Sequence, residues 1–338
     1  MPRRPLPFAG CAVFALGYVT LLTGCGVVGG ASATRTPSPT ATPTHTATVT
    51  QTSTPTSTPT PEPTATPTPA PPPQITISSE TLGQGTTMLV AVEPRAGASS
   101  ASLSFRGTDR QMVPDEDDEF WLPIGAPAGA ETGPAEIVVT IFEPDGSVRA
   151  TLAATVTITQ TLFPVEYLEV PVGGPNGLRP PEDVAYEENI RVNVYAGFTP
   201  AKYWSGPFIV PVAGAVTTVF GTARSFNGGP VSGNHSGEDY GAEIGTPVYA
   251  AASGAIAFAG ELTVRGNSII IDHGAGVFTA YHHLSRIDVV QGQFVGQGAL
   301  IGAVGMTGLA TGPHLHWELV VGGVNVNPVA WTVAGVAP

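Results

Sequence analysis

Three short motifs in the last third of this chain carry residue types from which a metal-dependent hydrolase can be built. Two imidazoles and one carboxylate can occupy three corners of a zinc tetrahedron and leave the fourth corner to water. Two further histidines could then move protons beside that water. The chain has seven histidines, and four of them stand in these motifs in such roles. The motifs are His235-Ser-Gly-Glu-Asp239, Tyr281-His-His-Leu284 and His314-Leu-His316-Trp-Glu, and the five candidate side chains are His235, Asp239, His283, His314 and His316.

The spacing of His314 and His316 predicts that both side chains share one groove. They stand two residues apart and run into an apolar stretch that ends at Val321, which favours a strand. Because alternate residues of a strand face the same side, both imidazoles should point one way, with Leu315 and Trp317 on the other face. A single His-x-His pair is common by chance, so its weight comes from the companion motifs.

His235 and Asp239 stand four residues apart, a spacing that also fits one face of a helix. The preceding segment from Gly228 to Gly237 is rich in glycine and is poor helix material. We therefore expect a loop that enters a strand, with both side chains near the start of the strand. The chain contains no His-Glu-x-x-His motif, which excludes the helical zinc arrangement of another protease class.

Composition points to short strands and turns as the elements that hold these residues. The chain has 338 residues, of which 12% are charged, with 42 Gly and 34 Pro. We predict a mainly all-β protein of more than one domain. The net charge of −13 argues against a nucleic-acid partner, which would favour a basic face. It also argues against a polybasic membrane anchor.

Residues 1–25 are predicted to be an export signal. Arg3 and Arg4 give a positive start, and the apolar run from Phe8 to Leu22 is short for a membrane span. The run ends in Leu22-Thr-Gly-Cys25, which resembles a bacterial lipobox. The resemblance implies cleavage before Cys25 and a lipid anchor on its thiol. A plain secretory signal with an incidental cysteine is the alternative. Removal of the segment would leave the mature chain without a possible disulfide.

The remaining chain divides into four predicted parts. Residues 26–73 are predicted to be a disordered, extended stalk with a reach on the order of 100 Å, because from about Ala31 onward they are nearly all Thr, Pro, Ser and Ala. Residues 74–160 show short strand-like runs and turns, which favours an immunoglobulin-like sandwich without a disulfide. Residues 161–206 form a connector with a short helix from Pro181 to Val192. Residues 207–338 return to strands and glycine turns and carry the candidate site.

The chain from about Trp204 onward resembles the lysostaphin-type, or LytM-type, zinc endopeptidases, which cut peptide bonds in bacterial cell walls. The resemblance rests on seven stretches in one register: Phe208-Ile-Val-Pro-Val-Ala-Gly, Val219-Phe-Gly-Thr-Ala-Arg224, His235-Ser-Gly-Glu-Asp239, Gly245-Thr-Pro-Val-Tyr-Ala250, Ile270-Ile-Asp-His-Gly274, Tyr281-His-His-Leu284 and Thr311-Gly-Pro-His-Leu-His-Trp-Glu318. It implies a β-sheet or barrel-like catalytic domain of the duplicated hybrid motif type. It also implies one zinc ion, peptidoglycan peptides as substrate and action in the cell envelope.

Carried over residue by residue, the family pattern assigns roles to all five candidates. It makes His235, Asp239 and His316 the zinc ligands, and His283 and His314 the catalytic pair. The pattern selects His283 because it directly precedes Leu284, and in a regular strand the adjacent His282 would point to the opposite face. We further expect His273 to be a turn residue near the groove and Glu318 to face solvent or stand behind a ligand.

Two other functions compete with catalysis. One is an inactive relative that activates other wall hydrolases, although such proteins typically lack a metal ligand and this chain keeps all of them. The other is a wall-binding module with structural zinc, against which three protein ligands argue, because structural sites usually have four. The peptide bond cut, the oligomeric state, any blocking of the groove by the N-terminal parts and the identity of the general base among the two histidines stay open.

Overall fold

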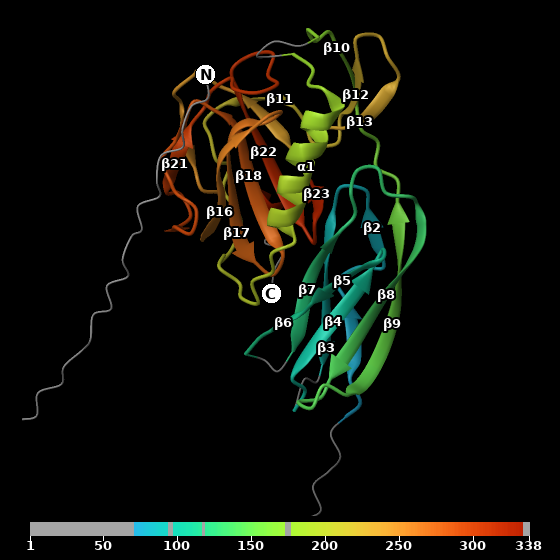
Figure 1. The fold of residues 1–338 in the computed structure, drawn as a ribbon. Coiled ribbons are helices and arrows are strands. Elements are labelled where there is room, and N and C mark those ends of the chain that lie inside the picture. Colours follow the sequence, from blue (N-terminus) through green and yellow to red (C-terminus); the bar gives the residue numbers. More distant parts are fainter. Residues whose placement is uncertain (1–70, 94–96, 117–118, 173–176, 334–338) are drawn as a thin grey trace, which may run out of the picture. The chain divides into compact units, whose positions relative to one another are not determined.

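The computed structural model describes residues 71–93, 97–116, 119–172 and 177–333 (Figure 1). The predicted signal segment with Cys25, and the predicted stalk except for residues 71–73, lie outside this part of the chain. The described residues form mostly strands, with two helices, α1 (Pro181–Tyr195) and α2 (Ala330–Val333), which confirms the all-β fold class. Within these same ranges, no helix is long and apolar enough to cross a membrane.

The segment from residue 74 to 159 forms two antiparallel-rich sheets that share one core. Val90 and Leu122 of one sheet and Leu103, Ile137 and Ile158 of the other are buried in the same apolar cluster. The first sheet has the order β1 (Gln74–Ile77), β3 (Thr87–Glu93), β7 (Phe120–Gly125), β6 (Val113–Pro114). The second has the order β2 (Thr81–Gly83), β9 (Val148–Thr159), β8 (Gly133–Phe142), β4 (Ser100–Phe105), β5 (Thr108–Gln111). A two-sheet sandwich is thus present, and its immunoglobulin-like connectivity stays a prediction.

An eight-stranded sheet carries the candidate site. Its main path runs in the order β11 (Ala215–Thr218), β14 (Glu238–Gly241), β22 (His314–Val321), β18 (Val277–Leu284), β17 (Gly266–Gly274), β16 (Gly254–Leu262), β20 (Phe294–Val295), and β23 (Val324–Val326) pairs with β22. All these pairings are antiparallel. Strands distant in the sequence therefore lie next to one another, and β14, β22 and β18 bring the three motifs together.

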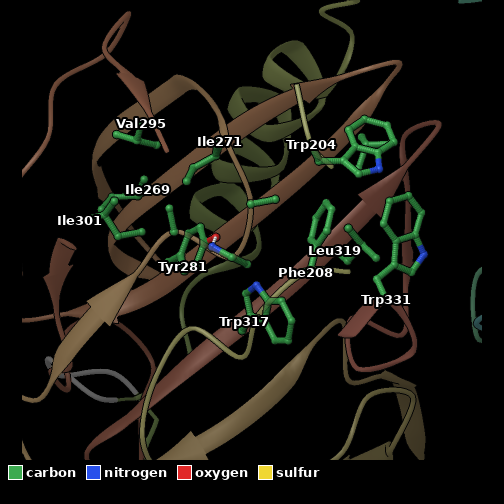
Figure 2. Packing of buried hydrophobic residues seen from close by; sticks show 14 of the residues in the cluster. Trp204, Phe208, Ile269, Ile271, Tyr281, Val295, Ile301, Trp317, Leu319 and Trp331 are labelled. Carbon is green, nitrogen blue, oxygen red and sulfur yellow. Dashed lines mark hydrogen bonds between the residues drawn. The ribbon is translucent and has the colours of Figure 1, made fainter. Parts of the chain in front are cut away.

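One face of β22 packs into the core and the other carries candidate site residues, as the alternation of its residues predicts. Leu315, Trp317, Leu319 and Val321 are fully buried in the main apolar core (Figure 2). The other face carries, in order along the strand, His314, His316, Glu318 and Val320. The core side therefore fixes the strand, while the opposite side is available for a polar site.

Helix α1 covers part of that second face, beside β16 (Figure 1). Pro181 opens the helix, and Glu182 and Asp183 lie in its first turn, where carboxylates favour the positive end of the helix dipole. The ring of Tyr195 packs edge-on against Phe278 at 5.4 Å, in a small cluster with Val320. The predicted connector helix is confirmed and extends three residues beyond Val192.

Two small sheets flank the central one. The connector contributes β10 (Val165–Leu168), which pairs in parallel with β12 (Ala223–Phe226), and β12 pairs with β13 (Val231–Asn234). Residues 165–168 therefore belong to the small sheet beside the site, because they are hydrogen-bonded to β12. The second small sheet has the order β15 (Pro247–Tyr249), β21 (Leu300–Ala303), β19 (Arg286–Ile287).

Candidate active site

A groove of about 480 Å³ opens where β22 begins. All five candidates line it: His235, Asp239, His283, His314 and His316. Its other walls come from β10, the β12–β13 hairpin and the loop around residues 309–313. The structure thus brings all five sequence-predicted residues to one cavity.

The three predicted metal donors converge at one point of the groove. Asp239 lies directly opposite His316 in the β14–β22 ladder, and His235 follows β13. The Nδ1 atom of His316 is 2.7 Å from Asp239 Oδ1 and 2.9 Å from His235 Nε2. His235 Nε2 is 3.0 Å from Asp239 Oδ1. These three residues are buried and form the group of potential metal ligands found in the described part of the chain.

Gly237 explains how His235 and Asp239 approach so closely. A Cβ at this position would lie 2.3 Å from the carbonyl oxygen of Trp317 and 3.0 Å from the ring of His316. The backbone that joins the two donors therefore rests directly on β22, and only glycine allows this contact.

The outer ring nitrogens indicate a cation between the donors. His235 Nδ1 contacts the carbonyl oxygen of Val219 at 3.1 Å, and His316 Nε2 contacts Glu318 Oε1 at 3.1 Å. Both partners are acceptors, so hydrogens on these two nitrogens would leave the inner nitrogens free to offer lone pairs to a metal ion. Two ring nitrogens and a carboxylate oxygen at about 3 Å repel one another unless a proton or a metal ion lies between them. Two imidazoles with one carboxylate fit zinc well.

The charges of the three donors also favour a bound cation. Burial alone would raise the pKa of Asp239, but His316 and His235 beside it hold that pKa below its usual range. Burial would lower the pKa of His316, and the Asp239 carboxylate outweighs it and raises that pKa. Burial lowers the pKa of His235. The carboxylate therefore stays ionised and offers its charge to whatever cation the pocket holds.

His283 and His314 are held in one shared arrangement. His283 Nδ1 donates to the carbonyl oxygen of Thr307 at 2.7 Å, and His314 Nδ1 donates to that of Gly312 at 2.8 Å. In both rings Nε2 is then the basic nitrogen. The two ring centres are 4.7 Å apart, and His314 Nε2 lies 3.8 Å from Asp239 Oδ1. Burial, together with the neighbouring His314, lowers the pKa of His283 well below its ordinary value, which keeps this ring neutral.

A β-bulge corrects the prediction that His282 points away from the site. The register against β17 shifts between Asn267 and Ile269, and His283 adopts a left-handed backbone with φ of 61°. The extra residue breaks the alternation, so His282 and His283 both lie on the metal side. His282 stands opposite His316 in the ladder, with the rings stacked at 5.6 Å. Its Nδ1 is 2.8 Å from Ser268 Oγ.

The structure decides between the two alternatives for Glu318 and corrects the expectation for His273. Glu318 stands behind a ligand and does not face solvent, because its side chain is fully buried against His316. His273 is not a turn residue at the groove, since it lies within β17 and its ring packs against Phe208 at 5.0 Å. Its Nδ1 donates to Ser253 O at 2.8 Å, and its Nε2 is 2.7 Å from Thr279 Oγ1.

Sequence reasoning missed the charged groups that support the donors. Arg224 Nη2 is 3.2 Å from Asp239 Oδ2, and its Nε is 3.2 Å from Glu166 Oε2 on β10. Arg265 donates to Glu318 from Nη2 at 3.0 Å. Burial would raise the pKa of Glu318, but Arg191 and Arg265 hold it well below its usual range. Only the occurrence of Arg224 at the end of a motif hinted at such a role.

The candidate site lies in a segment of the chain that matches a known protein family. Residues 233–328 match the family model described as Peptidase family M23. Over 96 residues the chain is 50% identical to the DD-carboxypeptidase/endopeptidase Mpg of Neisseria meningitidis serogroup B, which covers 28% of this chain and 22% of that protein. Over 93 residues it is 46% identical to the peptidoglycan DD-endopeptidase ShyA of Vibrio cholerae, again covering 28% and 22%. The chain therefore matches about a fifth of the length of these curated relatives.

A solved structure extends the likeness in fold beyond that segment. A protein of Pseudomonas aeruginosa assigned to peptidase M23 superposes with a TM-score of 0.55, covering 73% of this chain and 93% of its own, at 24% identity. At this identity the likeness concerns the fold alone. The match of residues 233–328 to the M23 peptidase family agrees with the motifs, and the superposition shows a common fold.

Proposed function

We propose that this protein is a zinc-dependent endopeptidase that hydrolyses peptide bonds in peptidoglycan. The observation that carries the proposal is the orientation of four imidazoles. The outer nitrogens of His235 and His316 are tied to oxygen acceptors, so the inner nitrogens face Asp239. The Nδ1 atoms of His283 and His314 are tied to carbonyl oxygens, so each Nε2 is free to act as a base. One group of three is arranged to hold a cation and the other pair to move protons.

The residues of the chain would divide the reaction as follows. His235 Nε2, Asp239 Oδ1 and His316 Nδ1 would hold the zinc ion, which supplies a Lewis acid and lowers the pKa of a coordinated water toward about 7. Nε2 of His283 or His314 would accept the proton of the attacking water. The protonated ring would then donate to the oxyanion or return the proton to the leaving amine.

The groove and the relatives' names support a peptide of the bacterial wall as substrate. The cavity of about 480 Å³ extends from the donors to walls formed by β10 and the β12–β13 hairpin, a volume in the range of small-ligand sites. Mpg is named a DD-carboxypeptidase/endopeptidase and ShyA a peptidoglycan DD-endopeptidase. We therefore propose a D,D cross-link as the bond that is cut, at the outer side of the cell membrane.

Digestion of purified sacculi tests this proposal. We expect the wild-type protein to release cross-link fragments, identified by mass spectrometry, and a chelator to stop their release until zinc is restored. Unchanged release after zinc removal would contradict zinc dependence. Zinc binding without any release, by a protein that stimulates other wall hydrolases, would support the rival function of a regulator.

We also propose that the chain is exported and lipid-anchored through Cys25, with the Thr/Pro-rich stalk between the anchor and the folded part. The support is the sequence from Leu22 to Cys25 after a short apolar run. Growth with labelled palmitate should label the wild-type chain and not a Cys25→Ala variant. Labelling of both proteins, or of neither, would contradict the anchor.

A further inference from the structure

The buried stripe of α1 is charged, which is unusual for a packing helix. The residues of α1 that are buried are Glu187, Arg191 and Tyr195, at 1%, 4% and 6% exposure. They are spaced by four residues and therefore share one helix face. Charged side chains are rarely buried unless they are paired, because removing them from water costs free energy. A helix that only had to cover the sheet would bury apolar side chains here.

The partners of this stripe form a chain of alternating charge that leads toward the metal donors. Arg191 Nη2 donates to Glu318 Oε2 at 2.7 Å. Glu187 accepts from Arg265 Nη1 at 2.8 Å and from the backbone N–H groups of Val264 and Arg265. Arg265 Nη2 in turn donates to Glu318 Oε1 at 3.0 Å. Two acids and two guanidinium groups thus offset one another's charge inside the protein.

Glu318 connects this chain to a donor. Its Oε1 accepts from Ser236 Oγ at 2.7 Å and lies 3.1 Å from His316 Nε2. Glu318 and His316 are two residues apart on the same face of β22. A carboxylate at Nε2 keeps the hydrogen on that atom and leaves Nδ1 with a lone pair toward Asp239. The carboxylate cannot turn away, because Arg191 and Arg265 hold both of its oxygens.

We propose that α1 of the connector is an outer part of the metal centre, in which Arg191 and Arg265 fix Glu318 and Glu318 acts as the positioning residue for His316. Arg191 and Glu187 lie outside residues 233–328, the segment that matches the peptidase family. The segment that carries the metal donors therefore depends on a helix that precedes it in the chain. This inference rests on the proposed function, since it needs the donors to bind zinc.

Zinc affinity of the full chain tests the proposal. The dissociation constant for zinc is measured at one neutral pH by competition with a chelating dye. We expect Glu318→Gln to weaken zinc binding by about 10-fold to 100-fold, the range for losing such an outer-shell partner. We expect Arg191→Met to weaken it about 10-fold, and Arg191→Lys, which keeps a cation near the carboxylate, to weaken it by less. Both arginine variants leave every zinc donor in place.

Glu188→Gln is the matched control. Glu188 lies on the same helix and binds the same Arg191 at 2.7 Å, but its side chain is 58% exposed and it does not contact Glu318. We expect this variant to bind zinc as the wild type does. A readout independent of affinity is the Nε2 hydrogen of His316 in the zinc-loaded protein, from nitrogen NMR. We expect this hydrogen to exchange slowly with water in the wild type and faster in Arg191→Met and Glu318→Gln.

The outcomes separate this inference from the function on which it rests. A wild-type chain that binds no zinc refutes the metal site itself. A wild type that binds zinc, with Glu318→Gln and Arg191→Met within about twofold of its affinity and with unchanged exchange of the His316 Nε2 hydrogen, refutes only the role of α1. If Arg191→Met does not fold, Glu318→Gln and Arg191→Lys decide the matter by the same measurements.

Discussion

The ion pairs that support the two sides of the donor group differ in how deeply they are buried. On one side, His316 rests on Glu318, whose side chain is fully buried, with Arg191 at 5% and Arg265 at 18% exposure. On the other side, Asp239 is met by Arg224 at 23% exposure, which pairs with Glu166 at 32%. Both supports reach back to the connector, one through α1 and one through β10.

This difference in burial should decide how much each ion pair contributes to stability. A buried carboxylate that loses its partner is left uncompensated in a medium of low dielectric, which is strongly destabilising. Arg224 is partly exposed and competes with water and salt, and Asp239 keeps His235 and His316 beside it, so losing Arg224 should have less effect. We therefore expect the two sides of one site to respond unequally to similar substitutions, although both touch a metal donor.

The largest expected effect comes from His283 and His314, which line the groove beside the donor group. Substitution of His283 or His314 by alanine should lower the rate of peptide release by about 100-fold to 10,000-fold, the range for losing a general acid or base. Zinc content should stay at the wild-type level, because neither ring belongs to the donor group. The measurement is turnover on sacculi alongside elemental analysis. Full turnover in either variant would remove the proposed role of that residue.

Breaking the buried side should destabilise the fold. Arg191→Met removes one partner of Glu318, and we expect the free energy of unfolding to fall by about 3–5 kcal/mol. Urea unfolding of the metal-free protein, followed by circular dichroism, measures this change. A loss below about 1 kcal/mol would show that the buried chain of charges behaves like a surface pair.

His273, a buried histidine outside the donor group, should make the stability of the protein depend on pH. Burial lowers the pKa of His273 to about 4, against about 6.5 in an unfolded chain. Between these values the unfolded form binds a proton that the folded form does not. Stability therefore falls as the pH drops from about 6.5 to 4, and this one group accounts for about 3 kcal/mol.

Unfolding midpoints of the metal-free protein across that pH range check the prediction. His273→Gln should flatten the pH dependence by about the stated amount, while the other buried histidines contribute equally to both proteins. An identical slope in wild type and variant would mean that His273 titrates normally in the folded state.

The smallest effect is expected on the exposed side. Arg224→Met should lower the free energy of unfolding by about 1 kcal/mol or less, and added salt should shrink the difference further. The same urea measurement at low and high salt tests it. A loss as large as that of Arg191→Met would erase the contrast between the two sides.

Alternation and motif spacing predicted the parts of the site that regular strands control. His314 and His316 share a face of β22, and Leu315 and Trp317 pack into the core, because nothing interrupts the period of two. The prediction for His282 failed because a bulge is set by the partner strand, where the register slips. Local sequence does not record that slip.

The support from α1 could not be predicted for a different reason. The start of the helix is readable from Pro181 and the acids after it. The role of Arg191 depends on Glu318, 127 residues further along the chain, for which the sequence left open whether it faces solvent or stands behind a ligand.

Elemental analysis of the purified full-length chain tests the central claim most directly. After incubation with zinc and removal of the excess, the wild-type protein should contain one zinc ion per chain, and Asp239→Ala should contain none. A folded wild type that takes up no zinc, or an Asp239→Ala variant that keeps one ion per chain, would contradict the assignment of His235, Asp239 and His316 as the metal donors.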